Sequence, residues 1–133
     1  MPELLVPISP GELIDKITIL EIKSARMTDP GKLKNVRAEL EALTATWRAS
    51  PLSAHDIAAH WQALRAVNEQ LWDIEDRIRD KERDAAFDAG FIELARAVYV
   101  TNDERAAIKK RINAQLGSAL VEEKSYSDYR RKQ

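Results

Sequence analysis

The fold is decided by residues 9–23, which read SPGELIDKITILEIK. Ser9, Pro10 and Glu12 mark a helix start, because serine accepts a hydrogen bond from a free amide and proline suits the first helical position. The pattern predicts a helix from residue 10 to about residue 27. Its apolar side chains point in nearly every direction around the axis: Leu13, Ile14, Ile17, Ile19, Leu20 and Ile22. Such a helix packs on most of its sides, so we expect it at the centre of a helical bundle.

Charged residues are interleaved with these apolar positions, namely Asp15, Lys16, Glu21 and Lys23. Some of them must be partly buried, where an unpaired charge is costly, so each buried one needs a partner. Two interpretations remain open. The charges form a structural ion-pair network, or they form a buried polar site together with Arg105 or Asn113.

Two further helices follow, over residues 30–48 and 54–84. Asp29 and Pro30 start the first of them, and Ser53 with Asp56 suits the start of the second. Both carry apolar residues at alternating three- and four-residue steps, which is the spacing of a coiled-coil seam, and Asn68 interrupts the second seam. We therefore predict that these two helices form a long antiparallel hairpin.

The length of the second helix predicts an oligomer. At about 1.5 Å per residue it would span on the order of 45 Å, which is more than the diameter of a small domain. We expect its far end to meet another chain, so that the protein forms a homodimer through the hairpin.

The stretch YVTNDERAAIKKRINAQL, residues 99–116, predicts a short helix over 91–98 and another over 103–116. Thr101 or Asn102 suits the cap of the last helix, and Gly117 suits its end. Asn102, Lys109 and Asn113 lie on one line of that helix, with Arg105 on the edge of its apolar stripe. Capping and interhelical hydrogen bonds explain these residues as well as a binding site does.

Composition limits the possibilities. A chain of 133 residues suits one all-α domain over residues 1–133, with residues 127–133 as a frayed tail. A net charge of −1 disfavours nucleic acid as a partner. The chain has no cysteine and no apolar run long enough to span a membrane, so we expect a cytoplasmic protein without membrane insertion.

Catalytic and metal motifs are missing from the sequence. His55 and His60 lie five residues apart and do not share a helix face, and we expect no metal site. Neither a phosphate-binding loop nor a dinucleotide fingerprint occurs, so we expect no cofactor. The acidic face of the 54–84 helix is laced with basic residues, and we expect surface pairs of Asp73 with Arg77 and of Glu75 with Arg79.

Three blocks of the sequence resemble a bacterial family classed as a domain of unknown function: SPGELIDKITIL, YxTNDERAxIKxxIN and EEKSY. The resemblance brings no activity, but it implies a loose link to cell-surface polysaccharide metabolism. It also implies which positions belong to the family pattern. From these we select the candidate ligand- or partner-binding residues Asp15, Lys16, Tyr99, Asn102, Arg105, Lys109, Asn113, Glu123, Lys124 and Tyr126; no catalytic residue is identified.

Two classes of function follow from this. The first is a non-catalytic interaction or regulatory module that binds an unidentified protein partner. The second is a small-molecule-binding protein or enzyme, in which Arg105 and Lys109 hold an anionic substrate. In its most concrete form, residues 13–26 are similar to the opening helix of all-α chorismate mutases, with Arg26 and Lys32 as carboxylate clamps. The sequence leaves open whether the protein is an enzyme.

Overall fold

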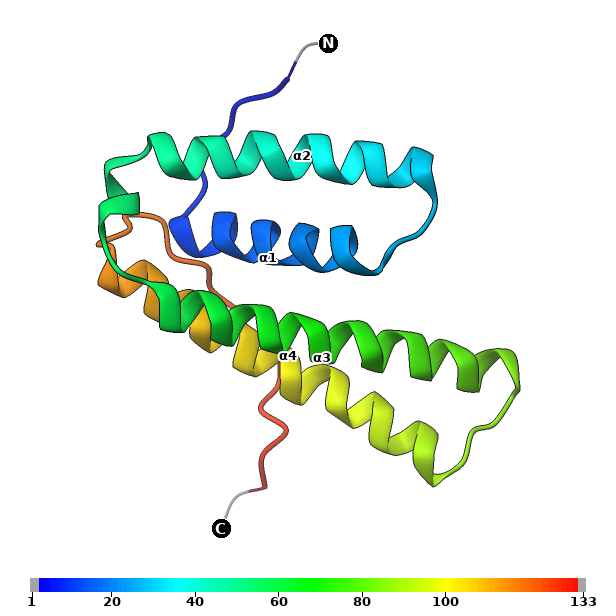
Figure 1. Cartoon of the computed structure of the whole chain (residues 1–133). Helices are drawn as coiled ribbons and strands as arrows, with labels where there is room; N and C mark the ends of the chain where they lie inside the picture. Colours follow the sequence, from blue (N-terminus) through cyan, green and yellow to red (C-terminus); the bar gives the residue numbers. More distant parts are fainter. Residues whose placement is uncertain (1–2, 132–133) are drawn as a thin grey trace.

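The computed structural model describes residues 3–131 and is all-α, as predicted (Figure 1). Its elements are α1 (Pro10–Arg26), α2 (Pro30–Ala49), the short 3-10 helix η1 (Pro51–Ala54), α3 (Ala58–Arg83) and α4 (Ala89–Gln115). Over residues 3–131, no helix is long and apolar enough to cross a membrane.

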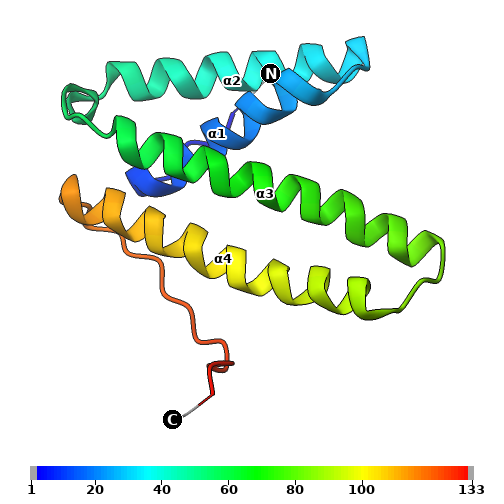
Figure 2. The ribbon, with the colours of Figure 1, turned by 60° about the horizontal axis from the view of Figure 1, so that its bottom comes forward.

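The helices form two hairpins, α1 with α2 and α3 with α4, and α1 packs on all three other helices. Figure 2 shows α1 between α2 and the α3–α4 pair. The predicted hairpin of α2 with α3 is therefore wrong, because α1 intervenes between them. The two helices meet near η1, where the rings of Trp47 and Trp61 pack edge to face at 6.1 Å.

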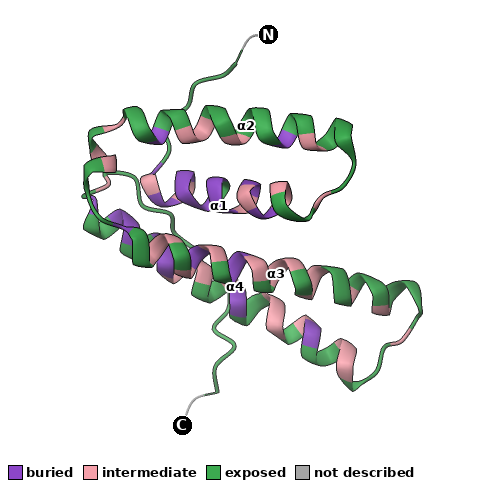
Figure 3. Ribbon diagram, viewed as in Figure 1, coloured by how far each residue is buried: buried purple, intermediate pink, exposed green. Residues whose placement is uncertain are grey.

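The core follows from the apolar residues of α1, and its central position is confirmed. Ile14, Ile17 and Ile22 are almost completely buried, together with Leu64 of α3 and Ile112 of α4. Figure 3 shows burial concentrated on α1 and on the parts of α3 and α4 that face it, whereas α2 is exposed along its outer face.

The starts of α1 and α2 are as predicted. The hydroxyl oxygen of Ser9 accepts a hydrogen bond from the Glu12 amide at 3.2 Å, and Asp29 accepts one from the Gly31 amide at 2.9 Å. Both helices have proline in the first turn. These caps satisfy amides that a helix start otherwise leaves free.

The predicted start of α3 is wrong. Ser53 lies inside η1 and donates to the Ser50 carbonyl at 2.8 Å, so it caps no α-helix. The helix begins at Ala58, whose amide donates to Asp56 at 3.0 Å, and it ends at Arg83. Pro51 allows a tight turn directly after α2, which uses residues that the sequence pattern assigned to α3.

One continuous helix, α4, replaces the predicted pair over 91–98 and 103–116. It begins after Asp88, which accepts from the Phe91 amide at 3.0 Å. Thr101 is buried in the helix interior instead of capping a helix start. Residues 91–116 contain no glycine or proline, and α4 packs along α3, so packing overrides the capping preference of Thr101 and Asn102. Gly117 ends the helix in the left-handed conformation, as predicted.

The first half of the continuous helix α4 also covers the far end of α3. This end projects beyond α1 but is paired with the first half of α4 (Figure 1). Lys81 of α3 binds Asp88 at 2.9 Å, and this pair closes the end of the hairpin. The far end of α3 already has a neighbour in its own chain, so its length does not require a second chain there.

Candidate functional site

Residues from all three blocks of the sequence meet where α1, the second half of α4 and the segment after α4 come together, and α3 adds one residue, Asn68, to this contact. We call the residues of this contact the junction network: Gly11, Glu12, Asp15, Thr18, Asn68, Arg105, Lys109, Asn113 and Glu122. Their positions in the chain are separated by up to 111 residues, from Gly11 to Glu122. The fold thus brings distant residues to one place.

Asp15 is the centre of the junction network and is only 1% exposed. One carboxylate oxygen accepts from the Arg105 Nε and from the Asn68 side-chain amide, each at 2.9 Å, and the other accepts from the Arg105 Nη2. The Asn68 amide also donates to the Thr18 hydroxyl at 3.0 Å. Burial opposes ionisation of Asp15, but the bonds from Arg105 and Asn68 outweigh it and lower the pKa of the carboxyl group. Asp15 and Arg105, whose contact the sequence left open, thus bind each other directly.

Lys109 is also buried, at 8% exposed. Its ammonium group lies 2.6 Å from Glu12, 3.0 Å from Glu122 and 3.6 Å from Asp15. Burial lowers the pKa of Lys109, but these carboxylates outweigh it, and the pKa is raised above its usual value. The bond from Lys109 likewise lowers the pKa of Glu122. Lys109 therefore stays charged and ties α1, α4 and the C-terminal segment together.

Asn113 joins α4 to the start of α1. Its side-chain oxygen accepts from the Gly11 amide at 2.7 Å, and both residues are buried. A β-carbon on Gly11 would lie 2.6 Å from the Lys109 carbonyl oxygen, so glycine is needed for this close approach. Asn113 thus makes a hydrogen bond between two helices, and its role in recognition stays a prediction.

The other candidates lie outside the junction network. Lys16 and Glu123 are exposed, and Glu123 is 4.0 Å from Lys110. Lys124 lies 3.7 Å from Glu122 and 5.7 Å from the centre of the Tyr126 ring. Asn102 is half-buried and, with Arg105, Lys109 and Lys124, lines a small cavity of about 250 Å³.

The charges of the junction network balance once the adjacent Lys124 is counted. Glu12, Asp15 and Glu122 supply three negative charges, and Arg105, Lys109 and the adjacent Lys124 supply three positive charges. Within residues 3–131, every buried side-chain nitrogen and oxygen has a hydrogen-bond partner. Arg105 and Lys109, the two cations of the network, are therefore both paired with carboxylates.

A larger groove lies beside the junction network, between α4 and the C-terminal segment of residues 118–130. We call it the tyrosine groove. Its volume is about 1000 Å³, and it is lined by residues 98–107 of α4 and 124–130 of the segment, including all three tyrosines of the chain. The rings of Tyr99 and Tyr129 lie 4.8 Å apart, whereas Tyr126 is 83% exposed. Reduced solvation and the Asp103 carboxylate raise the pKa of the Tyr129 hydroxyl.

The tyrosine groove collects four predicted residues, Tyr99, Asn102, Lys124 and Tyr126. Sequence reasoning missed Tyr129 as a member, and its three-residue spacing from Tyr126 was the one available signal. Residues 127–131 belong to the predicted frayed tail, and Tyr129 contacts α4. Residues 132 and 133 lie outside the described residues.

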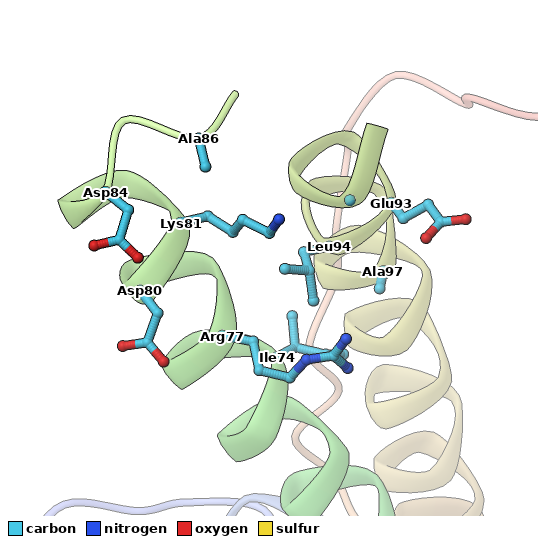
Figure 4. Close-up of a pocket in the computed structure, with 10 residues that line it drawn as sticks. Ile74, Arg77, Asp80, Lys81, Asp84, Ala86, Glu93, Leu94 and Ala97 are labelled. Carbon is cyan, nitrogen blue, oxygen red and sulfur yellow. The ribbon is translucent and has the colours of Figure 1, made fainter. Parts of the chain in front are cut away.

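The acidic face of α3 pairs partly as predicted. Glu75 and Arg79 lie 3.3 Å apart, but Asp73 binds Arg26 of α1 at 2.6 Å instead of Arg77. Figure 4 shows Arg77 and Lys81 reaching from α3 toward α4 across a cavity of about 550 Å³. Over residues 3–131, no group of three or more histidine, aspartate or glutamate side chains is placed to hold a metal ion.

The predicted carboxylate clamps, Arg26 and Lys32, lie in different surroundings. Arg26 turns to Asp73 and lies 4.0 Å from Glu69, so its charge is already paired by α3. Lys32 lies exposed in the first turn of α2.

A family model described as a family of unknown function (DUF6165) matches residues 4–130, and the chain belongs to this family. The match begins within the N-terminal segment and ends within the segment that lines the tyrosine groove. No curated protein matches the chain. No solved structure matches it either.

Proposed function

We propose that this member of a family of unknown function is a non-catalytic interaction module, and that it binds a segment of a partner protein in the tyrosine groove. The observation that carries the proposal is the gathering of Tyr99, Tyr126 and Tyr129 in one open groove beside a junction network whose charges are already paired. Binding is therefore assigned to the groove, and the network is assigned the task of holding it in place.

The groove has the features of a surface that binds an extended peptide. Tyrosine rings give large apolar contacts, and their hydroxyl groups still reach water or a partner. Asn102 adds an amide that can donate and accept, and Lys124 adds a positive charge. Aromatic and aliphatic side chains line the groove together with seven polar or charged residues, and such a mixed surface can bind a segment whose backbone also needs hydrogen bonds.

The alternative of an anionic small ligand has less support. Arg105 and Lys109, the cations it requires, are bound to Asp15, Glu12 and Glu122. A ligand would have to displace Glu122 before it reached Lys109. The chorismate version also needs Arg26, whose charge Asp73 pairs.

The cellular location, the metabolic context and the oligomeric state of the protein are inferred from the sequence. A cytoplasmic location and a link to cell-surface polysaccharide metabolism stay predictions. A homodimer also stays a prediction, although the hairpin of α2 with α3 that suggested it is not present.

The proposal is tested by capturing partners on the immobilised chain. Tyr126→Ala and Asn102→Ala change the groove, and Phe87→Ala is a matched control because Phe87 is an exposed aromatic residue at the far end of the hairpin. We expect a captured protein to be lost with both groove variants and kept with the control. Equal capture by all three variants would remove the groove from the proposal. Nucleotides, sugar phosphates and chorismate should not change the melting temperature in a thermal-shift assay. A rise in melting temperature that Lys109→Ala abolishes would favour the small-ligand alternative.

A further inference from the structure

We propose that the occupant of the tyrosine groove is the N-terminal arm of a second copy of this chain, where the arm is residues 3–8, ELLVPI. This inference rests on the proposed function, since it names the partner of the same groove. Leu4 and Leu5 are 93% and 92% exposed, and Val6 and Ile8 are exposed as well. Several large apolar side chains in sequence, all in water, mark a segment that packs against something.

The arm is set up to dock as an extended peptide. Residues 3–8 have no helical structure, and Pro7 restricts its own backbone and favours an extended conformation at Val6. The base of the arm is fixed, because Ser9 is buried and caps α1. A segment that is already extended loses little conformational entropy when it binds.

The tyrosine groove matches the arm in length and chemistry. Six extended residues span about 20 Å, and the α4 side of the groove, ten residues from Val98 to Ala107, is about 15 Å long. Aromatic grooves accept proline-containing extended segments, because flat rings pack against proline and aliphatic side chains. Lys124 and Arg130 line the groove together with the carboxylates of Asp103, Glu104 and Asp128, so the arm is matched by the aromatic and apolar side chains of the groove rather than by charge.

Within one chain, the N-terminal arm and the C-terminal segment that lines the tyrosine groove leave the bundle on opposite sides. Figure 1 shows the arm leaving the bundle past α2, whereas the C-terminal segment leaves past α4 on the opposite side. Figure 2 shows the C-terminal segment below α4 and α2 on the far side of the bundle. The arm therefore reaches a groove in another copy more readily than its own.

The test is the mass of the full chain in solution, measured by light scattering across micromolar concentrations. We expect a mass that rises above the 15.1 kDa of one chain. Leu5→Asp in the arm and Tyr126→Asp in the groove should each give a single chain. Both side chains are highly exposed, so the variants should fold, and circular dichroism checks this. Phe87→Asp, at the exposed end of the hairpin, is the control and should still associate.

Mixing the two variants gives the sharpest result. The Leu5→Asp chain keeps an intact groove and the Tyr126→Asp chain keeps an intact arm, so their mixture should form a one-to-one pair. A single-chain mass for the parent at every concentration would overturn the inference, and association that survives in both variants would do the same. Dissociation by Phe87→Asp alone would assign the contact to the hairpin. If a different protein is captured through the groove while the parent stays a single chain, the proposed function stands and the arm is not its partner.

Discussion

Replacing Arg105 by alanine should destabilise the fold by leaving Asp15 buried without its main partner. Removing one member of a buried ion pair typically costs about 3–5 kcal/mol. Here the Asn68 amide at 2.9 Å and Lys109 at 3.6 Å remain beside the carboxylate. We therefore expect the lower end, about 3 kcal/mol.

The expected loss corresponds to a measurable change in melting temperature. At about 2.1 cal/mol/K per residue, unfolding of a chain of this length has an entropy of about 0.28 kcal/mol/K, so a loss of about 3 kcal/mol lowers the melting temperature by about 11 °C. Circular dichroism at 222 nm follows the loss of helix. Arg111→Ala is the matched control, because Arg111 is exposed on the same helix and should melt close to the parent.

A second variant tests whether the loss comes from the orphaned charge. Asp15→Asn removes the charge but keeps a group that can bond with Asn68, so adding it to Arg105→Ala should recover part of the lost stability. If Arg105→Ala melts with the parent, or if Asp15→Asn adds its full separate cost in the double variant, the reasoning about a buried pair is refuted.

Four further outcomes follow from the junction network. Gly11→Ala should destabilise by about 1–3 kcal/mol, since its β-carbon would meet the Lys109 carbonyl oxygen, and urea titration measures this. Asn113→Ala should cost about 1–3 kcal/mol in the same assay by leaving the Gly11 amide unpaired, and a stable variant with weaker binding would restore the recognition role. Glu122→Gln should change stability by less than about 1 kcal/mol because that side chain is 43% exposed, although it should raise proteolysis of the segment after residue 117. The pKa of Asp15 is lowered in the fold, so its charged form stabilises the protein above the ordinary value of 3.8, and this stabilisation is lost on acidification. The pKa of Lys109 is raised, so its charged form stabilises the protein below 10.5, and this stabilisation is lost as the pH rises. Melting temperatures should therefore be nearly constant from about pH 5 to 9 and fall on both sides.

Local chemistry predicted the parts of the fold that depend on neighbouring residues. The caps at Ser9 and Asp29 and the end at Gly117 are set by side chains and backbone within a few positions, and they are present as predicted. The predicted cap at Thr101 or Asn102 also relied on neighbouring residues alone, and it is wrong. A capping residue is only a preference, and in α4 the packing along α3 continues through it.

The pairing of the helices could not be read from periodicity. The seams of α2 and α3 are compatible with each other, but they are equally compatible with an apolar helix between them. α1 is apolar on most sides and can accept α2, α3 and α4 together, which excludes a direct hairpin of α2 with α3. The apolar pattern of α1 predicted its central position, although the consequence for its neighbours required the tertiary structure.

Several candidate residues lie together in the structure, whereas their roles in binding stay predictions. The need of Asp15 for a buried partner followed from its place among apolar residues, and Arg105 on the edge of an apolar stripe was the right candidate. Glu122 and Tyr129 lie beyond the last helix, where no periodic pattern constrains their position. Their contacts to Lys109 and Tyr99 are therefore tertiary facts.

The junction network explains why an apolar central helix takes one orientation. Apolar contacts alone would tolerate rotation of α1 about its axis, because its sides are similar. Asp15 removes this freedom, since other rotations would bury its charge away from Arg105 and Asn68, and we infer that the network specifies the packing more than it adds stability. Lys109 binds Glu122, and this ion pair holds the segment that carries Lys124 and Tyr126 against α4. In this way one buried carboxylate fixes both the helix at the centre of the bundle and the outer side of the groove proposed to bind a partner.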